Sequence, residues 1–361
     1  MNKIIIYINT LVVLLVFASC SQVDDENVSN KGTLLKKYPQ SPIVINSDIL
    51  KNPKSATRAY YLKDSIWPNN TGITYFYEND EIAADGVYKR YVYPGAILRG
   101  GSIETRRPTP LSAPVDPINI SFSFPNTYTV GNIPIPSLYA TRQSLTNAML
   151  DKNMHGKQSI SFEYNISEIS SFEEAKLTFG SNIDVMKVFK LGVSYTNHKK
   201  QRKTLVMANV IHRFYTIDMD LPTDGNLLLN NEDINKFGPY SPVYVSSVTY
   251  GRMGVITVES DSTFSSVQRA LNMSFDAVKV SGKLNIDDRT ETILTNSIIK
   301  ISIEGGQSPE ATIEGLNAFK NFIETKGEFS IENQGEPLFF SLNYLSDNSP
   351  YYTKFQINIP K

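Results

Sequence analysis

The hydrophobic pattern of the chain opens with a short apolar segment behind one positive charge. Lys3 precedes residues 4–17, which are mostly apolar, and small residues then lead to Cys20. The apolar run is shorter than the ~20 residues that a helix needs to cross a bilayer, and its flanks are those of an export signal. Because Cys20 is the only cysteine and follows the small residues directly, we predict a lipoprotein signal peptide over residues 1–19 and lipid attachment at Cys20. The alternative is an ordinary signal peptide with an incidental cysteine.

Residues 20–55 follow with little apolar periodicity. They combine the acidic run 24–26 with Asn, Ser, Lys and Pro, a composition that buries too little apolar surface to order itself. We predict a flexible tether over 20–55 and a folded part over 56–361. The acidic run resembles the surface-export signal of lipoproteins in the Bacteroidota. That resemblance implies an outer-membrane lipoprotein at the cell surface. Release from the surface, by a cut in the tether, is the alternative location.

The composition of the folded part favours strands and narrows the chemistry. Twenty Tyr and eighteen Phe accompany many β-branched residues, which is typical of a β-rich α+β protein. The 35 basic and 36 acidic side chains nearly cancel, so nucleic acid is not an expected partner. The three histidines have no metal-ligand spacing, and we find no nucleophile motif or phosphate-binding loop. We therefore predict no enzyme, no catalytic residues, no metal and no cofactor.

Residues 172–200 alternate between apolar and polar positions. From Ala175 to Tyr195 the odd positions are mostly apolar, with Ser181 and Lys187 as the weakest points. This period of two is that of an amphipathic strand. A segment of this length holds two strands of ~9–11 residues and a turn, which is the size of a transmembrane β-hairpin.

Residues 264–297 carry two conflicting patterns. The apolar positions keep one strand phase up to Asp276 and the opposite phase after it, as a hairpin turn produces. The first half also places Val267, Leu271 and Phe275 on one helix face, behind Ser262 or Thr263 as a plausible N-cap. Taken alone, the segment favours an amphipathic helix followed by an edge strand.

Seven short motifs between residues 90 and 306 carry a resemblance to a known family. They are YPGAIL (93–98), RPT (107–109), PSLYA (136–140), LGV (191–193), FYTI (214–217), VSSVTYGR (245–252) and ISIEGG (301–306). In this order they resemble motifs of the cholesterol-dependent cytolysins, also called thiol-activated cytolysins. Each motif is weak alone, but the shared order of all seven argues against a chance match.

The resemblance implies the membrane-attack/cytolysin fold, in which two helical bundles flank a bent antiparallel sheet. In that family each bundle refolds into a transmembrane β-hairpin when a ring of subunits becomes a barrel pore, and the insertion segments 172–200 and 264–297 match the two bundles. Their mixed periodicity fits such a switch, because one sequence has to satisfy repeats of about 3.6 and 2.0 residues. Gly305 and Gly306 match a glycine pair at which an edge-covering strand swings away, although a tight turn is the plainer interpretation.

Two further sites carry over by position. Tyr250, Gly251 and Arg252 would begin the strand that pairs with the next subunit. The aromatic residue that senses hairpin pairing in the family falls at Phe172 or Ser171, and we assign it to Phe172.

The chain also departs from the family after Gly306. We expect a helix over 308–325 and strands over 339–345 and 354–359 to finish the core. The family's C-terminal cholesterol-binding sandwich has no counterpart in this sequence, so the chain resembles the short form found in Bacteroidota, and cholesterol recognition does not carry over.

The predicted function is that of a pore-forming toxin component. It would oligomerise with itself or with a longer cytolysin-like homologue, and its other partner would be a lipid of the target membrane. Lys187, Lys190 and Arg269 lie within the proposed spanning stretches and argue against insertion by this chain alone. Two alternatives remain, a lipid-anchored surface binding or adhesion protein and an inhibitory subunit that caps a ring. A hydrolase ranks last.

Overall fold

The computed structural model divides the chain into two units, residues 1–34 and 35–361. Within the second unit it describes residues 35–47, 59–124, 129–150, 161–169, 172–183, 202–222, 225–229, 233–305, 310–325 and 329–361. The signal peptide and lipid attachment at Cys20 therefore lie outside the described residues and stay predictions.

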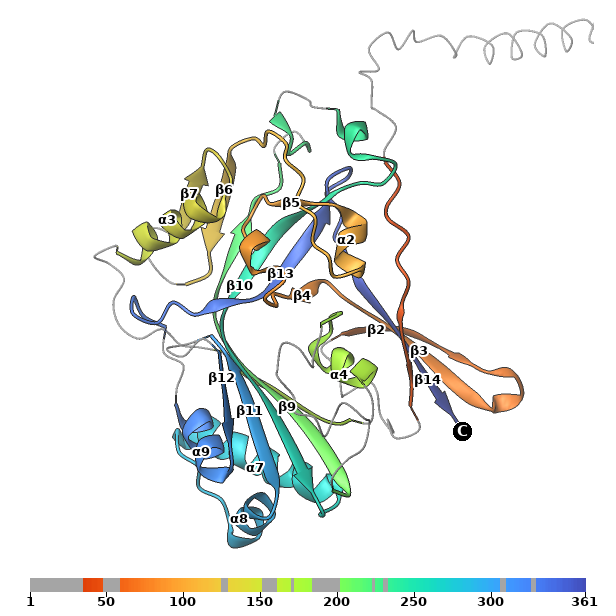
Figure 1. The fold of residues 1–361 in the computed structure, drawn as a ribbon, viewed down its shortest axis with the longest axis vertical. Coiled ribbons are helices and arrows are strands. Elements are labelled where there is room, and N and C mark those ends of the chain that lie inside the picture. The colour runs from red at the N-terminus through yellow and green to blue at the C-terminus, as the bar shows by residue number, and fades with distance from the viewer. Residues whose placement is uncertain are drawn as a thin grey trace, which may run out of the picture. The chain divides into compact units, whose positions relative to one another are not determined.

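Two long antiparallel strands form the spine of the larger sheet, β9 (Thr204–Met219) and β10 (Val243–Ser260) (Figure 1). Both are rich in β-branched and aromatic residues, and most of their side chains are buried. Their pairing runs from Ser247 opposite Asp218 to Ser260 opposite Thr204, with a register shift at Tyr250. On its outer side each long strand pairs with one strand along its first part and with another along its second part. The sheet therefore has two halves with different strands beside β9 and β10.

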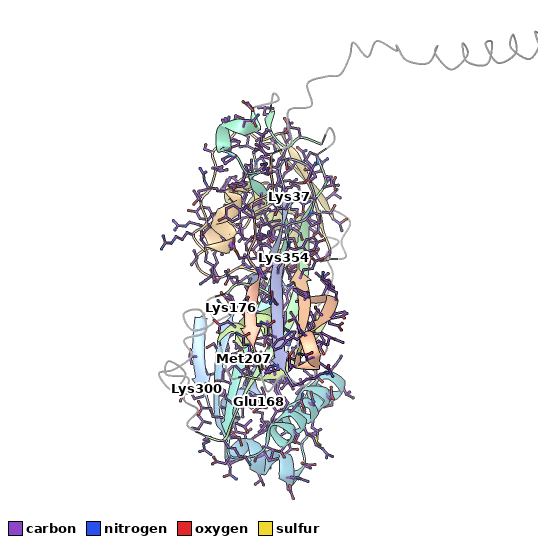
Figure 2. All side chains as sticks on the ribbon, turned by 90° about the vertical axis from the view of Figure 1, so that its right-hand side faces the viewer. Lys37, Glu168, Lys176, Met207, Lys300 and Lys354 are labelled. Atoms are coloured by element: carbon purple, nitrogen blue, oxygen red, sulfur yellow. The ribbon has the colours of Figure 1, made fainter. Side chains whose placement is uncertain are left out.

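Among the described residues the larger sheet has ten strands, all paired antiparallel. In the half with the C-terminal part of β9, the neighbours are β4 (Glu81–Ala83), β5 (Ile97–Leu98), β6 (Ile118–Phe122), β7 (Val130–Ile133) and β13 (Glu336–Tyr344). In the other half they are β8 (Ser161–Glu168) on β9, β11 (Ile298–Glu304) on β10 and β12 (Glu310–Glu314) on β11. One row of partners in this half runs from Met207 in β9 through Thr257 in β10 and Lys300 in β11 to Glu314 in β12. Figure 2 labels Met207 and Lys300 in this half.

The helices lie beside a sheet whose strands all pair antiparallel, which confirms the α+β class. α2 (Gly100–Glu104) and α3 (Leu138–Met149) belong to the first half, and α3 packs on β7. α7 (Phe264–Ser281), α8 (Asp288–Thr295) and α9 (Leu316–Glu324) lie beside β8, β9, β11 and β12 (Figure 1). α4 (Phe172–Phe179) lies near β8 and β9. Among the described residues, none of the helices combines the length and apolarity that a bilayer-spanning helix requires.

A separate four-stranded sheet has the order β1-β14-β3-β2. Its strands are β1 (Ile43–Asn46), β2 (Tyr60–Ile66), β3 (Gly72–Asn79) and β14 (Thr353–Pro360). The tether predicted over 20–55 is therefore wrong for residues 35–47. β1 pairs parallel with β14, which gives its backbone hydrogen-bond partners, and Ile45 is fully buried.

The C-terminal predictions are correct for both strands and partly wrong for the helix. β13 and β14 cover the predicted strands 339–345 and 354–359 to within a few residues. The helix predicted over 308–325 begins only at Leu316, because Gly315 has a φ of +88° and interrupts the helical path. Residues 310–314 instead form β12, which pairs with the edge of β11.

Candidate functional site

Both predicted insertion segments connect strands that are direct neighbours. Residues between β8 and β9 join Glu168, opposite Val206, to the start of β9, and residues between β10 and β11 join Glu259 to Ile298, its partner. All four strand ends lie at one end of the sheet, where α7 and α8 are found (Figure 1). Each insertion segment thus occupies the position of a hairpin loop between two antiparallel strands. Extending the strands into the segments would lengthen two existing hairpins without changing their order.

The second insertion segment is helical in this structure. Thr263 caps α7 by accepting a hydrogen bond from the Ser266 amide, and Gly282 ends the helix with a φ of 72°. The prediction of an edge strand after this helix is wrong. Residues Asp288–Thr295 form α8 instead, and Asp287 caps it by accepting a 2.7 Å hydrogen bond from the Thr290 amide. That bond lowers the pKa of Asp287 below its usual value. The β-hairpin predicted for this segment would form in the membrane-inserted state and stays a prediction.

The buried face of α7 explains why this segment is a helix and not a strand in this structure. Phe275 is fully buried, and its ring centroid lies 4.8 Å from that of Tyr164 in β8 and 6.0 Å from that of Phe319 in α9. Tyr164 also donates a 2.8 Å hydrogen bond to Asp276. Val280, which shares a strand phase with Val278, is 88% exposed. The helix therefore buries one set of apolar residues and leaves a member of the strand pattern in water.

Amide side chains of the core hold the first insertion segment. Asn209 of β9 donates to the Thr178 carbonyl at 3.2 Å, and Asn79 of β3 donates to the Gly180 carbonyl at 3.1 Å, just behind α4. These bonds satisfy carbonyls that the end of the helix leaves free. We did not single out either asparagine from the sequence, although Asn209 interrupts an apolar strand and so gave a signal. Phe172 is the first residue of α4, its role as pairing sensor stays a prediction, and residues 184–200 lie outside the described residues.

A short strand covers the outer edge of β11. β12 pairs with it from Lys300 opposite Glu314 to Glu304 opposite Glu310. Gly305 follows β11 with a φ of +79°, and a Cβ there would lie 2.5 Å from the carbonyl oxygen of Gly251. Both the backbone angle and the close approach require glycine. Gly306 lies outside the described residues, and the hinge role of the pair stays a prediction.

Tyr250, Gly251 and Arg252 lie in the interior of the sheet. β10 pairs with β9 on one side and with β13 and then β11 on the other, and the Tyr250 ring stacks on Tyr215 with centroids 5.0 Å apart. In this structure β10 therefore has neighbours on both sides at Tyr250 and Gly251, and Arg252 lies between its β13 and β11 partners, so these residues do not lie on the open edge strand that we predicted. The strand whose edge needs only the removal of β12 is β11.

Two buried basic side chains lie opposite each other near the register shift of the long strands, His212 in β9 and Arg252 in β10. His212 is 5% exposed, packs on Phe162 with ring centroids 5.0 Å apart, and lies opposite Arg252. Its Nδ1 has no hydrogen-bond partner among the described residues. Burial, and to a smaller extent the Arg252 charge, lower the pKa of His212 to about 4. His212 is therefore neutral at pH 7.

We expect this histidine to make the fold acid-sensitive. Its pKa rises from about 4 in the fold to 6.5 on unfolding, so its contribution to stability is complete above pH 6.5 and is lost as the pH falls toward 4. Between pH 7.5 and pH 5 the loss is about 2 kcal/mol. Urea unfolding at both pH values measures it, and His212→Gln should lose correspondingly less stability. An equal loss in both proteins would assign the effect to other groups, such as His155 and His198.

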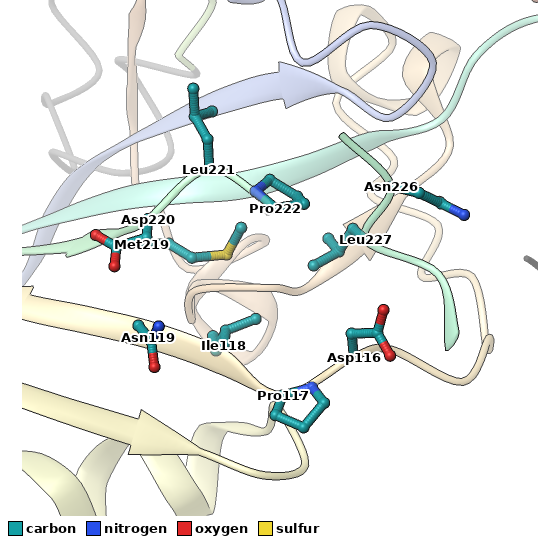
Figure 3. A pocket seen from close by; sticks show the side chains of 10 residues that line it. All are labelled: Asp116, Pro117, Ile118, Asn119, Met219, Asp220, Leu221, Pro222, Asn226 and Leu227. Atoms are coloured by element: carbon teal, nitrogen blue, oxygen red, sulfur yellow. The ribbon is translucent and has the colours of Figure 1, made fainter. Parts of the chain in front are cut away.

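The described residues can be compared with two common kinds of catalytic site, a metal cluster and a pocket with a nucleophile beside a base. They contain no group of three or more His, Cys, Asp or Glu side chains placed to hold a metal. A pocket of about 450 Å³ lies beside the start of β6 and includes Asp116, Asn119, Asp220 and Leu221 (Figure 3). It brings together carboxylates and apolar side chains but no nucleophile paired with a base.

Comparison with known proteins agrees with this architecture. The structure of the human-specific toxin intermedilysin matches with a TM-score of 0.67 at 21% identity, over 91% of this chain and 72% of intermedilysin. Suilysin from Streptococcus suis matches with a TM-score of 0.67 at 21% identity, over 90% of this chain and 72% of suilysin. The fold is thus the α+β fold of the cytolysins.

The sequence gives the same answer at the level of the family. The model of the thiol-activated cytolysins matches residues 78–355, and the chain belongs to this family. Tetanolysin of Clostridium tetani is 25% identical over 275 residues, which are 71% of this chain and 51% of tetanolysin. Hemolysin of Bacillus cereus is 24% identical over 282 residues, 73% of this chain and 57% of the hemolysin. The chain therefore spans a little over half the length of these curated relatives.

Proposed function

We propose that this protein is a pore-forming toxin component that assembles into a ring and forms a β-barrel pore in a target membrane. The observation that carries the proposal is the placement of both insertion segments between neighbouring antiparallel strands at one end of the sheet. A β-barrel satisfies all backbone hydrogen bonds inside a bilayer. Four strands lengthened from β8, β9, β10 and β11 are a natural repeat of such a barrel.

Ring assembly would use the two outer strands of this group. β12 covers β11 in the described structure, and its removal would expose an edge with unpaired backbone groups. An edge of a neighbouring copy, or of a longer cytolysin-like homologue, would then pair with it. The membrane partner is a lipid of the target cell, and the producer would hold the protein at its outer surface through lipid on Cys20.

A scan of single cysteines along α7 tests the proposal. In a Cys20→Ala background, an environment-sensitive dye at position 280 should move from water in the free protein to lipid after addition to liposomes. Val278 should follow it into lipid, while Lys279 and Ser281 stay in water, because a strand alternates its side chains between the two faces of a barrel. Dye release from the same liposomes measures the pore. A pattern without alternation would refute the hairpin, and rings without dye release would favour the capping subunit.

A further inference from the structure

α9 connects the cover of the β11 edge to the second insertion segment. It follows β12 after the single residue Gly315. Phe319 of α9 packs on Phe275 of α7, and a Glu324 carboxylate oxygen accepts a 2.7 Å hydrogen bond from the amide of Leu284, in the loop after α7. Removal of α9 would therefore loosen α7 as well as β12.

One side chain of the sheet contacts the C-terminal part of α9 directly. Arg252 of β10 is 9% exposed, donates a 3.0 Å hydrogen bond from Nη1 to the Thr325 carbonyl, and places its guanidinium 4.5 Å from the centre of the Phe322 ring. Phe322 fits closely here, because a Cβ on Gly254 would lie 2.0 Å from its ring. Arg252 thus lies beneath the element that the proposed assembly has to move.

The charge of Arg252 is poorly compensated in this position. Among the described residues it forms no ion pair with a carboxylate, and burial lowers its pKa. Its partner across the β9–β10 pair is His212, which offers no negative charge. A buried guanidinium gains a little from a carbonyl oxygen and an aromatic face, but it loses the much larger hydration free energy of a cation.

The position of Arg252 along β10 fits a role in movement. β10 pairs with β13 up to Gly251 and with β11 from Met253 onward, so Arg252 lies where the strand changes its neighbour. Withdrawal of α9 would open this point to water and hydrate the guanidinium. The guanidinium therefore loses hydration free energy while α9 is packed on the sheet, and it would regain that free energy when α9 leaves.

We propose that Arg252 is a positioning residue that biases α9 and β12 toward release from the sheet. The inference rests on the proposed function, in which β12 leaves the edge of β11. Arg252 would keep the soluble protein poised, so that contact with a membrane or a neighbouring subunit needs to supply less free energy to free the edge. If Arg252 only held α9 on the sheet, its removal would destabilise the packed α9. If it biases α9 toward release, its removal would stabilise the packed α9, so the direction of the change distinguishes the two roles.

The test compares Arg252→Met with Arg252→Lys, which keeps a charge. Hydrogen exchange of the α9 and β12 amides is measured in the monomer without membranes. We expect Arg252→Met to slow this exchange at least tenfold, to raise Tm by a few degrees and to slow ring formation on liposomes, while Arg252→Lys stays close to wild type. Faster exchange or a lower Tm in folded Arg252→Met would overturn the proposal. Arg252→Gln, also neutral, decides in the same way if the Met variant fails to fold.

Two arms separate this inference from its alternatives. Glu328, three residues after Thr325, lies outside the described residues, so Glu328→Gln is tested in wild type and in Arg252→Met. No coupling is expected, and a loss of Tm in wild type that vanishes in Arg252→Met would reveal an ion pair and contradict the proposal. Exchange in the monomer does not depend on pores. Slower exchange in Arg252→Met together with absent dye release from wild type would therefore reject the proposed function and keep the role of Arg252 in releasing α9.

Discussion

A disulfide that fastens β12 to β11 should abolish ring formation and dye release. Ser302 and Thr312 are direct partners in this antiparallel pair, so cysteines at both positions are within bonding range. The crosslink would keep the edge of β11 paired and leave a neighbouring subunit no backbone groups to bind. Electrophoresis that preserves oligomers and dye release from liposomes measure both effects, and reduction should restore them.

The matched control places a disulfide where no opening is expected. Asn119 of β6 and Asn132 of β7 are also direct partners, and their side chains are joined by a 2.9 Å hydrogen bond. Both disulfide variants carry Cys20→Ala, so that no other cysteine is present. Asn119→Cys with Asn132→Cys should leave ring formation and dye release unchanged, whether its disulfide is oxidised or reduced. Rings that form with the β11–β12 disulfide intact would show that assembly uses another edge.

Truncation of Phe275 should lower the stability of the soluble protein more than any other change predicted for this chain. The ring is fully buried between Tyr164 of β8 and Phe319 of α9, so Phe275→Ala removes contacts to both neighbours and leaves a cavity. We expect the free energy of unfolding to fall by about 3–5 kcal/mol. Denaturant titration measures this change. Hydrogen exchange should show that the α7 amides lose protection first, since α7 loses its main anchor on the sheet.

Val280 provides the matched control on the same helix. It is 88% exposed, so Val280→Lys should change the stability of the soluble protein by less than about 0.5 kcal/mol. In a membrane-inserted hairpin the same charge would cost about 2–4 kcal/mol at mid-bilayer depth. Phe275→Ala should therefore weaken the soluble state, and Val280→Lys should weaken only the pore. Normal dye release by folded Val280→Lys would argue that this residue does not face lipid.

The residues of α7 show the limit of prediction from sequence. Thr263 as N-cap and the face formed by Val267, Leu271 and Phe275 were visible in the sequence, and both are present. The same residues also carry a strand period, and nothing local decides between the two. Contacts distant in sequence favour the helix, because Tyr164 and Phe319 pack on Phe275 and bury it in this state.

β1 and β12 could not be predicted, for a related reason. Each is short, four and five residues, and such segments have weak intrinsic preference. β1 is a strand because β14 offers it a free edge, and β12 is a strand because β11 does. Sequence alone placed the first within a tether and the second within a helix, since unpaired edges are a property of the assembled sheet.

By itself the sequence determined the α+β class, the order of motifs that resembles the cytolysin family, and the mixed periodicity of the two segments predicted to insert, because these depend on local pattern and residue type. Tertiary structure alone decided which strand has the coverable edge. It assigned that edge to β11 and buried Tyr250, Gly251 and Arg252 in the interior of the sheet. It also left Arg252 beneath α9 without a carboxylate partner among the described residues. The physical reason is that edges and buried charges arise from the neighbours that a residue acquires on folding, and those neighbours are distant in sequence.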